Sequence, residues 1–279
     1  MVAEEFGIDA AQVRITATTT GKVPNTSATA ASSGADLNGM AAKQAAATIK
    51  SRLADFAAKK WKIAKNRIRF DGGQVLIGNY SIAFGDLARQ AHMARISLSS
   101  TGYYATPKIV WDRAKARGRP FFYFAYGAAC SEVTIDTLTG EMRVDRVDIL
   151  HDVGRSLNPA LDIGQVEGGF VQGMGWLTTE ELVYDKEGRL RTHAPSTYKI
   201  PCASDVPADF RVRLFESKGN KEDTIYRSKA VGEPPLMLAI SVWTAIFDAI
   251  AALKTGKIPA LDAPATPEAI LRAVKGMDS

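Results

Sequence analysis

The amino-acid sequence predicts an α+β fold in which mixed sheets pack against helices. Three observations lead to this class. Segments that alternate apolar and polar residues, as strands do, occur along much of the chain, and a long amphipathic helix pattern starts at Asp36. The two kinds of segment follow no strict strand–helix–strand order. No internal repeat or low-complexity linker interrupts the 279 residues, so the simplest organisation is a single domain over 1–279.

The first part of the chain predicts, in order, a strand (13–19), a loop (22–39), a helix (36–61), a hairpin (67–70 with 74–77) and a short helix (85–95). The long helix is predicted because apolar residues recur every three or four positions as far as Trp61. Ser33 is placed to cap it. The turn of the hairpin is Asp71-Gly72-Gly73, which suits the positive φ angles of tight turns.

The rest of the chain predicts strands at 121–129, 131–137, 142–150 and 210–215, an apolar helix at 236–253 and a last helix that opens at Thr266-Pro267-Glu268. In the strand at 142–150 the apolar positions change parity between Val144 and Val147. This change predicts a β-bulge, because one extra residue reverses the face of every side chain after it.

Composition narrows the class of protein. A net charge of +5, without a stripe of basic and aromatic residues, gives little support to nucleic-acid binding. Cys130 and Cys202 are too few for an iron–sulfur cluster, which usually takes four thiolates, and indicate two buried thiols in a reducing cytosol. The start of the chain has no apolar signal region. Asp248 interrupts the apolar run at 234–253, which leaves it short of the roughly 18 uncharged residues of a membrane span.

Three segments have the residues for chemistry, and each has a structural alternative. Small residues at 26–35 precede a long helix and suit either an anion site or an ordinary helix start. Five glycines in 162–176 let another group approach a helix closely around Gln165, or serve helix packing. Glu233, followed by Pro234-Pro235, lies at the mouth of an apolar and therefore buried helix. It is either a general base close to the core or a carboxylate that complements the helix dipole.

Taken together, these segments resemble one family. The stretches PNTSATAASSGADLNGMA, FYFAYGAACSEVTIDTLTGE, VGRSLNPALDIGQVEGGFVQGMGW, APSTYKIP and SKAVGEPPL are similar, in the same order, to the C-terminal half of the molybdenum-binding subunit of the molybdenum hydroxylases. PSTYKIP and SKAVGEPPL are similar to the xanthine dehydrogenase branch, rather than to the aldehyde or carbon monoxide branches. The resemblance implies a C-terminal molybdopterin-binding domain that takes part in the oxidative hydroxylation of hypoxanthine and xanthine to urate.

The resemblance also implies roles for individual residues. Glu233 matches the catalytic glutamate that acts as general base, and Gln165 matches a glutamine that hydrogen-bonds the pterin. Ala30, Ala31 and Ser32 match the loop that closes over the cofactor. Ala30 and Ala31 would line the substrate side, Ser32 would offer a polar contact, and the backbone of Ala31 would lie near molybdenum.

The same resemblance implies partners. The family's molybdenum subunit is much longer, so the chain corresponds to a fragment or to one subunit of a split enzyme. It would need the N-terminal half of the molybdenum subunit, a subunit or domains with 2Fe-2S clusters and FAD, and a dimer of complete units in the cytoplasm. Alone it should be inactive and should expose apolar surface. Two alternatives stay open, which are hydroxylation of another N-heterocycle or an aldehyde, and a non-catalytic role in cofactor handling or assembly.

Overall fold

The computed structural model describes residues 1–17, 19, 21, 29, 30 and 32–278. By its internal contacts the chain divides into a first unit, Met1–Phe122, and a second unit, Tyr123–Ser279. Each unit has a hydrophobic core of its own. The prediction of a single domain over 1–279 stays a prediction.

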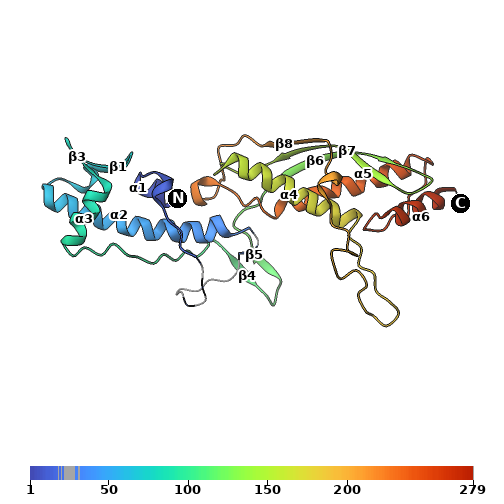
Figure 1. The fold of residues 1–279 in the computed structure, drawn as a ribbon, viewed down its shortest axis with the longest axis horizontal. Coiled ribbons are helices and arrows are strands. Elements are labelled where there is room, and N and C mark those ends of the chain that lie inside the picture. Colours follow the sequence, from blue (N-terminus) through green and yellow to red (C-terminus); the bar gives the residue numbers. More distant parts are fainter. Residues whose placement is uncertain (18, 20, 22–28, 31, 279) are drawn as a thin grey trace. The chain divides into compact units, whose positions relative to one another are not determined.

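The elements of the first unit are short apart from one helix (Figure 1). They are α1 (Val2–Phe6), η1 (Ala10–Gln12), η2 (Gly34–Gly39), α2 (Met40–Trp61), η3 (Lys65–Arg67), β1 (Ile68–Asp71), β2 (Gln74–Ile77), β3 (Tyr80–Ala83), α3 (Phe84–Met93), β4 (Val110–Asp112) and β5 (Arg117–Arg119). The predicted long helix, hairpin and short helix are confirmed. One face of α2 packs on β1–β3 and α3, which buries Leu53, Ala57, Val75 and Leu87.

Two expectations for the first unit are wrong. The described residues of 13–19 form no strand, and Ile15 is 95% exposed, so the alternating pattern has no sheet to pack on. Ser33 makes no side-chain cap to the helix, because its hydroxyl donates instead to the carbonyl of Ala30 at 2.7 Å.

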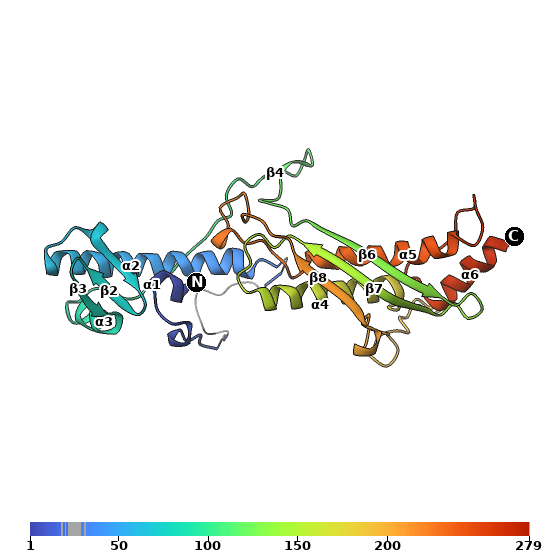
Figure 2. The same cartoon turned by 90° about the horizontal axis from the view of Figure 1, so that it is seen from above.

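The second unit is built from one sheet and several helices (Figure 2). Its elements are β6 (Gly127–Ile135), β7 (Met142–His151), α4 (Pro159–Thr178), η4 (Ala203–Asp205), β8 (Asp209–Leu214), η5 (Ile225–Arg227), η6 (Pro234–Ala239), α5 (Ile240–Ala251) and α6 (Pro267–Asp278). The predicted last helix is confirmed, with the amide of Ala269 donating to the hydroxyl of Thr266 at 3.3 Å. The strands predicted at 121–129 and 131–137 prove to be one strand that begins only at Gly127. The prediction of two buried thiols is wrong, because Cys130 and Cys202 are both exposed.

The sheet of the second unit is mixed, as predicted. Its order is β6-β7-β8, with β6 antiparallel and β8 parallel to β7. Glu132 pairs with Arg146 and Val133 with Val144, so Asp145 is the extra residue of the predicted β-bulge. Because of this bulge, Val144 and Val147 both point into the core.

Helices cover one face of this sheet. Val166 and Phe170 of α4 and Val242 and Ile246 of α5 share a core with the inward residues of β7. The 18-residue segment Pro234–Ala251 is long and apolar enough to cross a membrane, contrary to the expectation that it falls short. In the structure 28% of this segment is buried, and its buried residues Val242, Ile246 and Ile250 belong to the core of the second unit.

Candidate functional site

Helix α4 presents Gln165 on a smooth part of its surface. The helix begins after Asn158, whose side chain accepts a hydrogen bond from the amide of Leu161, and Pro159 fits its first turn. Gln165 is exposed. A Cβ atom added to Gly164 or Gly168 would meet nothing within 4 Å. A flat group could therefore lie directly against the helix backbone beside an amide that both donates and accepts hydrogen bonds.

A second pair of α4 glycines, Gly169 and Gly173, packs against the segment that carries Glu233. A Cβ atom on Gly169 would lie 3.1 Å from Cβ of Pro235 and 3.3 Å from the carbonyl oxygen of Gly232. On Gly173 it would lie 2.2 Å from the carbonyl oxygen of Leu236. Gln165 precedes Gly169 by one helical turn, on the same side of α4. The fold thus brings the segment that carries Glu233 to the same side of α4 as Gln165.

Glu233 lies at the start of η6 with helical backbone angles, φ −95° and ψ −38°. Its carbonyl accepts a hydrogen bond from the amide of Leu236 at 3.0 Å, while Pro234 and Pro235 have no amide hydrogen to satisfy. The side chain is exposed in the described residues, so the expectation of a carboxylate near the core is wrong for this chain. The helix behind it is also buried on one side only, because Met237 and Ile240 are 50% and 45% exposed.

A largely buried ion pair, Lys229 with Asp152, lies beside His151 at the end of β7, and the sequence alone did not predict it. Nζ of Lys229 lies 2.5 Å from Oδ2 of Asp152, and their side chains are 8% and 15% exposed. His151, the last residue of β7, is 1% exposed. Neither of its ring nitrogens has a hydrogen-bond partner among the described residues. The available signal was a lysine four residues before Glu233, in the stretch SKAVGEPPL.

Burial lowers the pKa of His151 below its usual value of 6.5. The neighbouring carboxylate of Asp152 raises this pKa, and the ammonium of Lys229 lowers it further. The imidazole is therefore neutral at physiological pH, beside an ion pair that is already balanced.

The predicted residues of the small-residue loop belong to the first unit. Ala30 is exposed, and its carbonyl accepts hydrogen bonds from the amide and hydroxyl of Ser33. Ser32 has a left-handed backbone, φ 52°, which is uncommon for a residue other than glycine. Ala31 lies outside the described residues. The assignments of Ala30, Ala31 and Ser32 stay predictions.

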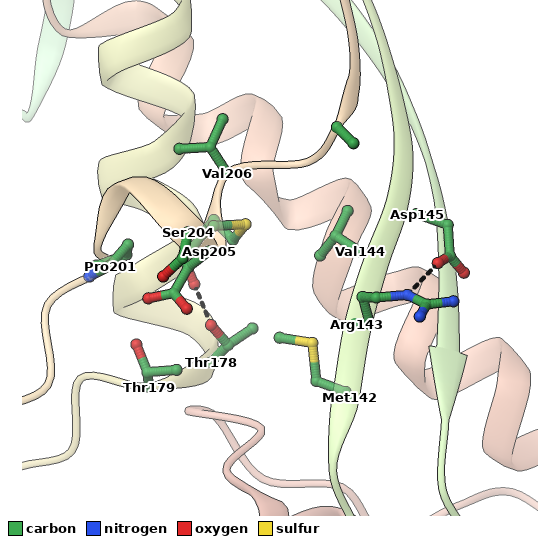
Figure 3. A pocket seen from close by; sticks show the side chains of 12 residues that line it. Met142, Arg143, Val144, Asp145, Thr178, Thr179, Pro201, Ser204, Asp205 and Val206 are labelled. Carbon is green, nitrogen blue, oxygen red and sulfur yellow. Dashed lines mark hydrogen bonds and ion pairs between the residues drawn. The ribbon is translucent and has the colours of Figure 1, made fainter.

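A cavity of about 530 Å³ lies at the C-terminal end of α4 (Figure 3). Thr178 and Thr179 at the end of the helix, Pro201 and Asp205 of the following loop, and Val144 of β7 line it. The stretch PSTYKIP, residues 195–201, is hydrogen-bonded to this end of α4. The hydroxyl of Tyr198 donates to Glu180 at 2.7 Å, and the hydroxyl of Thr179 donates to the carbonyl of Lys199 at 2.8 Å. This motif therefore has a structural role in the second unit.

Among the residues that the structure describes, no group of three or more His, Cys, Asp or Glu side chains is arranged to hold a metal ion.

A family model described as a molybdopterin cofactor-binding domain matches residues 1–207. The chain belongs to this family. It is 48% identical to the xanthine dehydrogenase/oxidase of Felis catus over 273 residues, which are 95% of this chain and 19% of the relative. It is 42% identical to aldehyde oxidase 1 of Cavia porcellus over 277 residues, which are 98% of this chain and 19% of that protein.

Among solved structures, quinoline 2-oxidoreductase from Pseudomonas putida 86 has the same fold, with a TM-score of 0.82 and 26% identity. The alignment covers 99% of this chain and 34% of that one. The predicted membership in the molybdenum hydroxylases, the α+β fold and the molybdopterin cofactor are thereby confirmed. The chain spans about a fifth of the length of the curated relatives it matches, 19% in the first two.

The geometry of α4 fits a pterin. The open backbone at Gly164 and Gly168 would accept a flat heterocycle, and Gln165 lies between them with its amide exposed. The closely packed Gly169 and Gly173 have a different role, which is to hold the Glu233 segment against the helix.

Proposed function

We propose that the chain is the C-terminal half of the molybdenum-binding subunit of a xanthine dehydrogenase, in which Glu233 is the general base for the hydroxylation of hypoxanthine and xanthine to urate. The observation that carries the proposal is the contact of Gly169 with Gly232 and Pro235. It places the Glu233 segment beside the turn of α4 that carries Gln165. The 48% identity to a xanthine dehydrogenase/oxidase supports the choice of substrate.

Each proposed residue has one task. Glu233 accepts the proton of the oxygen nucleophile, a contribution typically worth about 10²–10⁴-fold in rate. Gln165 hydrogen-bonds the pterin through its amide and orients it against α4. By the family resemblance, Ala30 and Ala31 would leave room for a flat purine, Ser32 would offer a polar contact to the cofactor, and the Ala31 backbone would be expected near the metal. When bound, the molybdenum–pterin group supplies the two-electron redox chemistry.

The proposal requires partners that cover the site. A general base works best where water is excluded, yet the side chain of Glu233 is exposed in the described residues. The apolar side chains of Leu161 in α4 and Met237 in η6 are exposed too. In this proposal the missing partners cover these apolar side chains. The proposed cover is the N-terminal half of the molybdenum subunit. Iron–sulfur and FAD domains or subunits would receive the electrons, in a cytoplasmic dimer of complete units.

A second candidate function keeps the chemistry and changes the substrate. The 42% identity to an aldehyde oxidase and the fold shared with quinoline 2-oxidoreductase favour an aldehyde or another N-heterocycle. A non-catalytic role in cofactor handling is the remaining alternative. It predicts that the chain alone binds the pterin cofactor and passes it to another protein.

The decisive experiment is anaerobic reduction of the assembled enzyme by xanthine, with quinoline and an aldehyde in parallel. Wild type and Glu233→Gln are compared at equal molybdenum content, and Glu181→Gln, another exposed carboxylate of the second unit, is the matched control. We expect xanthine to reduce wild type and Glu181→Gln but not Glu233→Gln. Equal rates for all three would overturn the assignment of the base. Reduction by an aldehyde or quinoline but not by xanthine would favour the second candidate.

A further inference from the structure

The segment that leads into Glu233 is attached to the end of β7 by its backbone. The amide of Lys229 donates to the carbonyl of Val153 at 2.8 Å, and Gly154 and Ser228 form an antiparallel bridge. The amide of Ala230 donates to the hydroxyl of Tyr123 at 2.7 Å. Three consecutive residues are thus held immediately before the site.

The side chain of Lys229 reinforces this attachment from inside the unit. Its ammonium is paired with Asp152 at 2.5 Å and lies 4.8 Å from the ring centre of Tyr126. Asp152 is itself fixed, because its Oδ1 accepts a hydrogen bond from the amide of Gly154 at 2.8 Å. The pair therefore joins two segments that are 77 residues apart in the sequence.

The other side of Glu233 is held by α4. Gly232 and Pro235 touch Gly169, and the carbonyl of Leu236 touches Gly173. The chain is therefore anchored at Lys229 upstream and at Pro235 downstream, with Glu233 between the two anchors. A shift of either anchor moves the backbone from which the carboxylate projects.

The choice of an ion pair for the upstream anchor has a physical meaning. Two buried charges cost desolvation free energy, and apolar residues of similar volume often stabilise a fold as well or better. What the ion pair adds is direction, since charge-assisted hydrogen bonds favour a narrow range of distances and angles. Beside it His151 stays neutral, so no second cation competes for Asp152.

We propose that the buried Lys229–Asp152 ion pair is a positioning element for the Glu233 carboxylate. This inference rests on the proposed function, since it assigns Lys229 and Asp152 a role only if Glu233 is the base. Neither residue touches the reacting atoms in this proposal. Both act through the backbone of 229–233.

The test uses the chain assembled with the rest of the molybdenum subunit and its redox partners, with xanthine as substrate. The variants are Lys229→Met, Lys229→Arg, Asp152→Asn and the double variant Lys229→Met/Asp152→Leu. Lys199→Met is the matched control, because Lys199 pairs with Asp205 at 2.6 Å on the surface of the same unit. Molybdenum content, Tm, kcat and KM are measured for each, together with Glu233→Gln.

We expect Lys229→Met and Asp152→Asn to lower kcat about 10–100-fold, as small misplacements of a reacting group do, while KM changes by less than about 3-fold. Lys229→Arg should recover most of the rate, and Lys199→Met should behave as wild type. The double variant should regain Tm but not kcat, because apolar packing restores stability but does not fix the orientation of the segment that carries Glu233.

Two results would overturn the inference alone. One is a double variant that regains kcat together with Tm, which a purely structural role predicts. The other is a kcat for Lys229→Met within about 3-fold of wild type while Glu233→Gln is inactive. An active Glu233→Gln variant would instead overturn the assignment of the base, and the inference with it. If Lys229→Met does not fold, the double variant and Lys229→Arg decide by the same criteria.

Discussion

At the scale of single residues, His151 is a buried imidazole without a hydrogen-bond partner among the described residues. It is 1% exposed, and its Nδ1 lies where a Cβ atom on Gly127 would come within 2.6 Å. A buried polar atom without a partner costs about 1–3 kcal/mol, and a charged imidazole here would cost more. The residue is therefore tolerated in its neutral form only.

This predicts that the chain loses stability in mild acid. Above about pH 6.5 His151 is neutral in both the folded and the unfolded chain, so its titration has no effect. Below that pH His151 takes up a proton in the unfolded chain but stays neutral in the folded chain. As the pH falls from there to the pKa of His151 in the folded chain, each pH unit lowers the free energy of unfolding by about 1.4 kcal/mol. Urea unfolding at pH 7.5 and 5.5, followed through hydrogen exchange in β7 and α5 of the second unit, measures the loss.

His151→Leu should remove much of this acid sensitivity, whereas His193→Leu, at an exposed position, should not. The same loss between the two pH values in His151→Leu and in wild type would contradict the explanation.

At the scale of elements, the contact between α4 and η6 decides where the candidate base lies. Two pairs of α4 glycines look equivalent in sequence, but Gly169 and Gly173 meet η6, whereas Gly164 and Gly168 meet open space. Close packing of this kind needs glycine, because even a methyl group would overlap the backbone of η6 at Gly173.

The two pairs should therefore respond in opposite directions to alanine. Gly173→Ala puts a Cβ atom 2.2 Å from the carbonyl oxygen of Leu236, so η6 must move, at a cost of about 1–3 kcal/mol. Gly168→Ala meets nothing within 4 Å and gains helix propensity, about 0.5–1 kcal/mol. Unfolding free energies of the two variants test this. A stable Gly173→Ala variant would show that η6 is not held by this contact.

At the scale of the whole molecule, the chain has two separate hydrophobic cores. Leu53 is 1% exposed in the core of the first unit, and Ile246 is 0% exposed in the core of the second. Unfolding of such a chain is not expected to be a single two-state transition.

Core truncations should therefore act on one unit at a time. Leu53→Ala and Ile246→Ala should each destabilise their own unit by about 2–5 kcal/mol. Hydrogen exchange measured by mass spectrometry resolves the two. Leu53→Ala should speed exchange in α2 and leave α5 unchanged, and Ile246→Ala should do the reverse. Faster exchange in both helices for either variant would mean that the units unfold together.

Much of the fold followed from local patterns. The period of α2, the turn glycines of the β1–β2 hairpin, the cap at Thr266 and the change of parity in β7 each depend on residues close in sequence. The strand expected at 13–19 failed for the opposite reason, since a strand needs a partner and alternation alone does not supply one.

For the candidate site, the sequence by itself determined the family, through long motifs in a fixed order, and it picked out Gln165 and Glu233. Only the tertiary structure decided which glycines of α4 receive the Glu233 segment, that Glu233 is exposed in this chain, and that Lys229 pairs with Asp152. The physical reason is distance along the chain. Local patterns act within one or two turns, whereas the Lys229–Asp152 pair joins residues 77 positions apart and exists only when β7 and the 228–230 segment have come together.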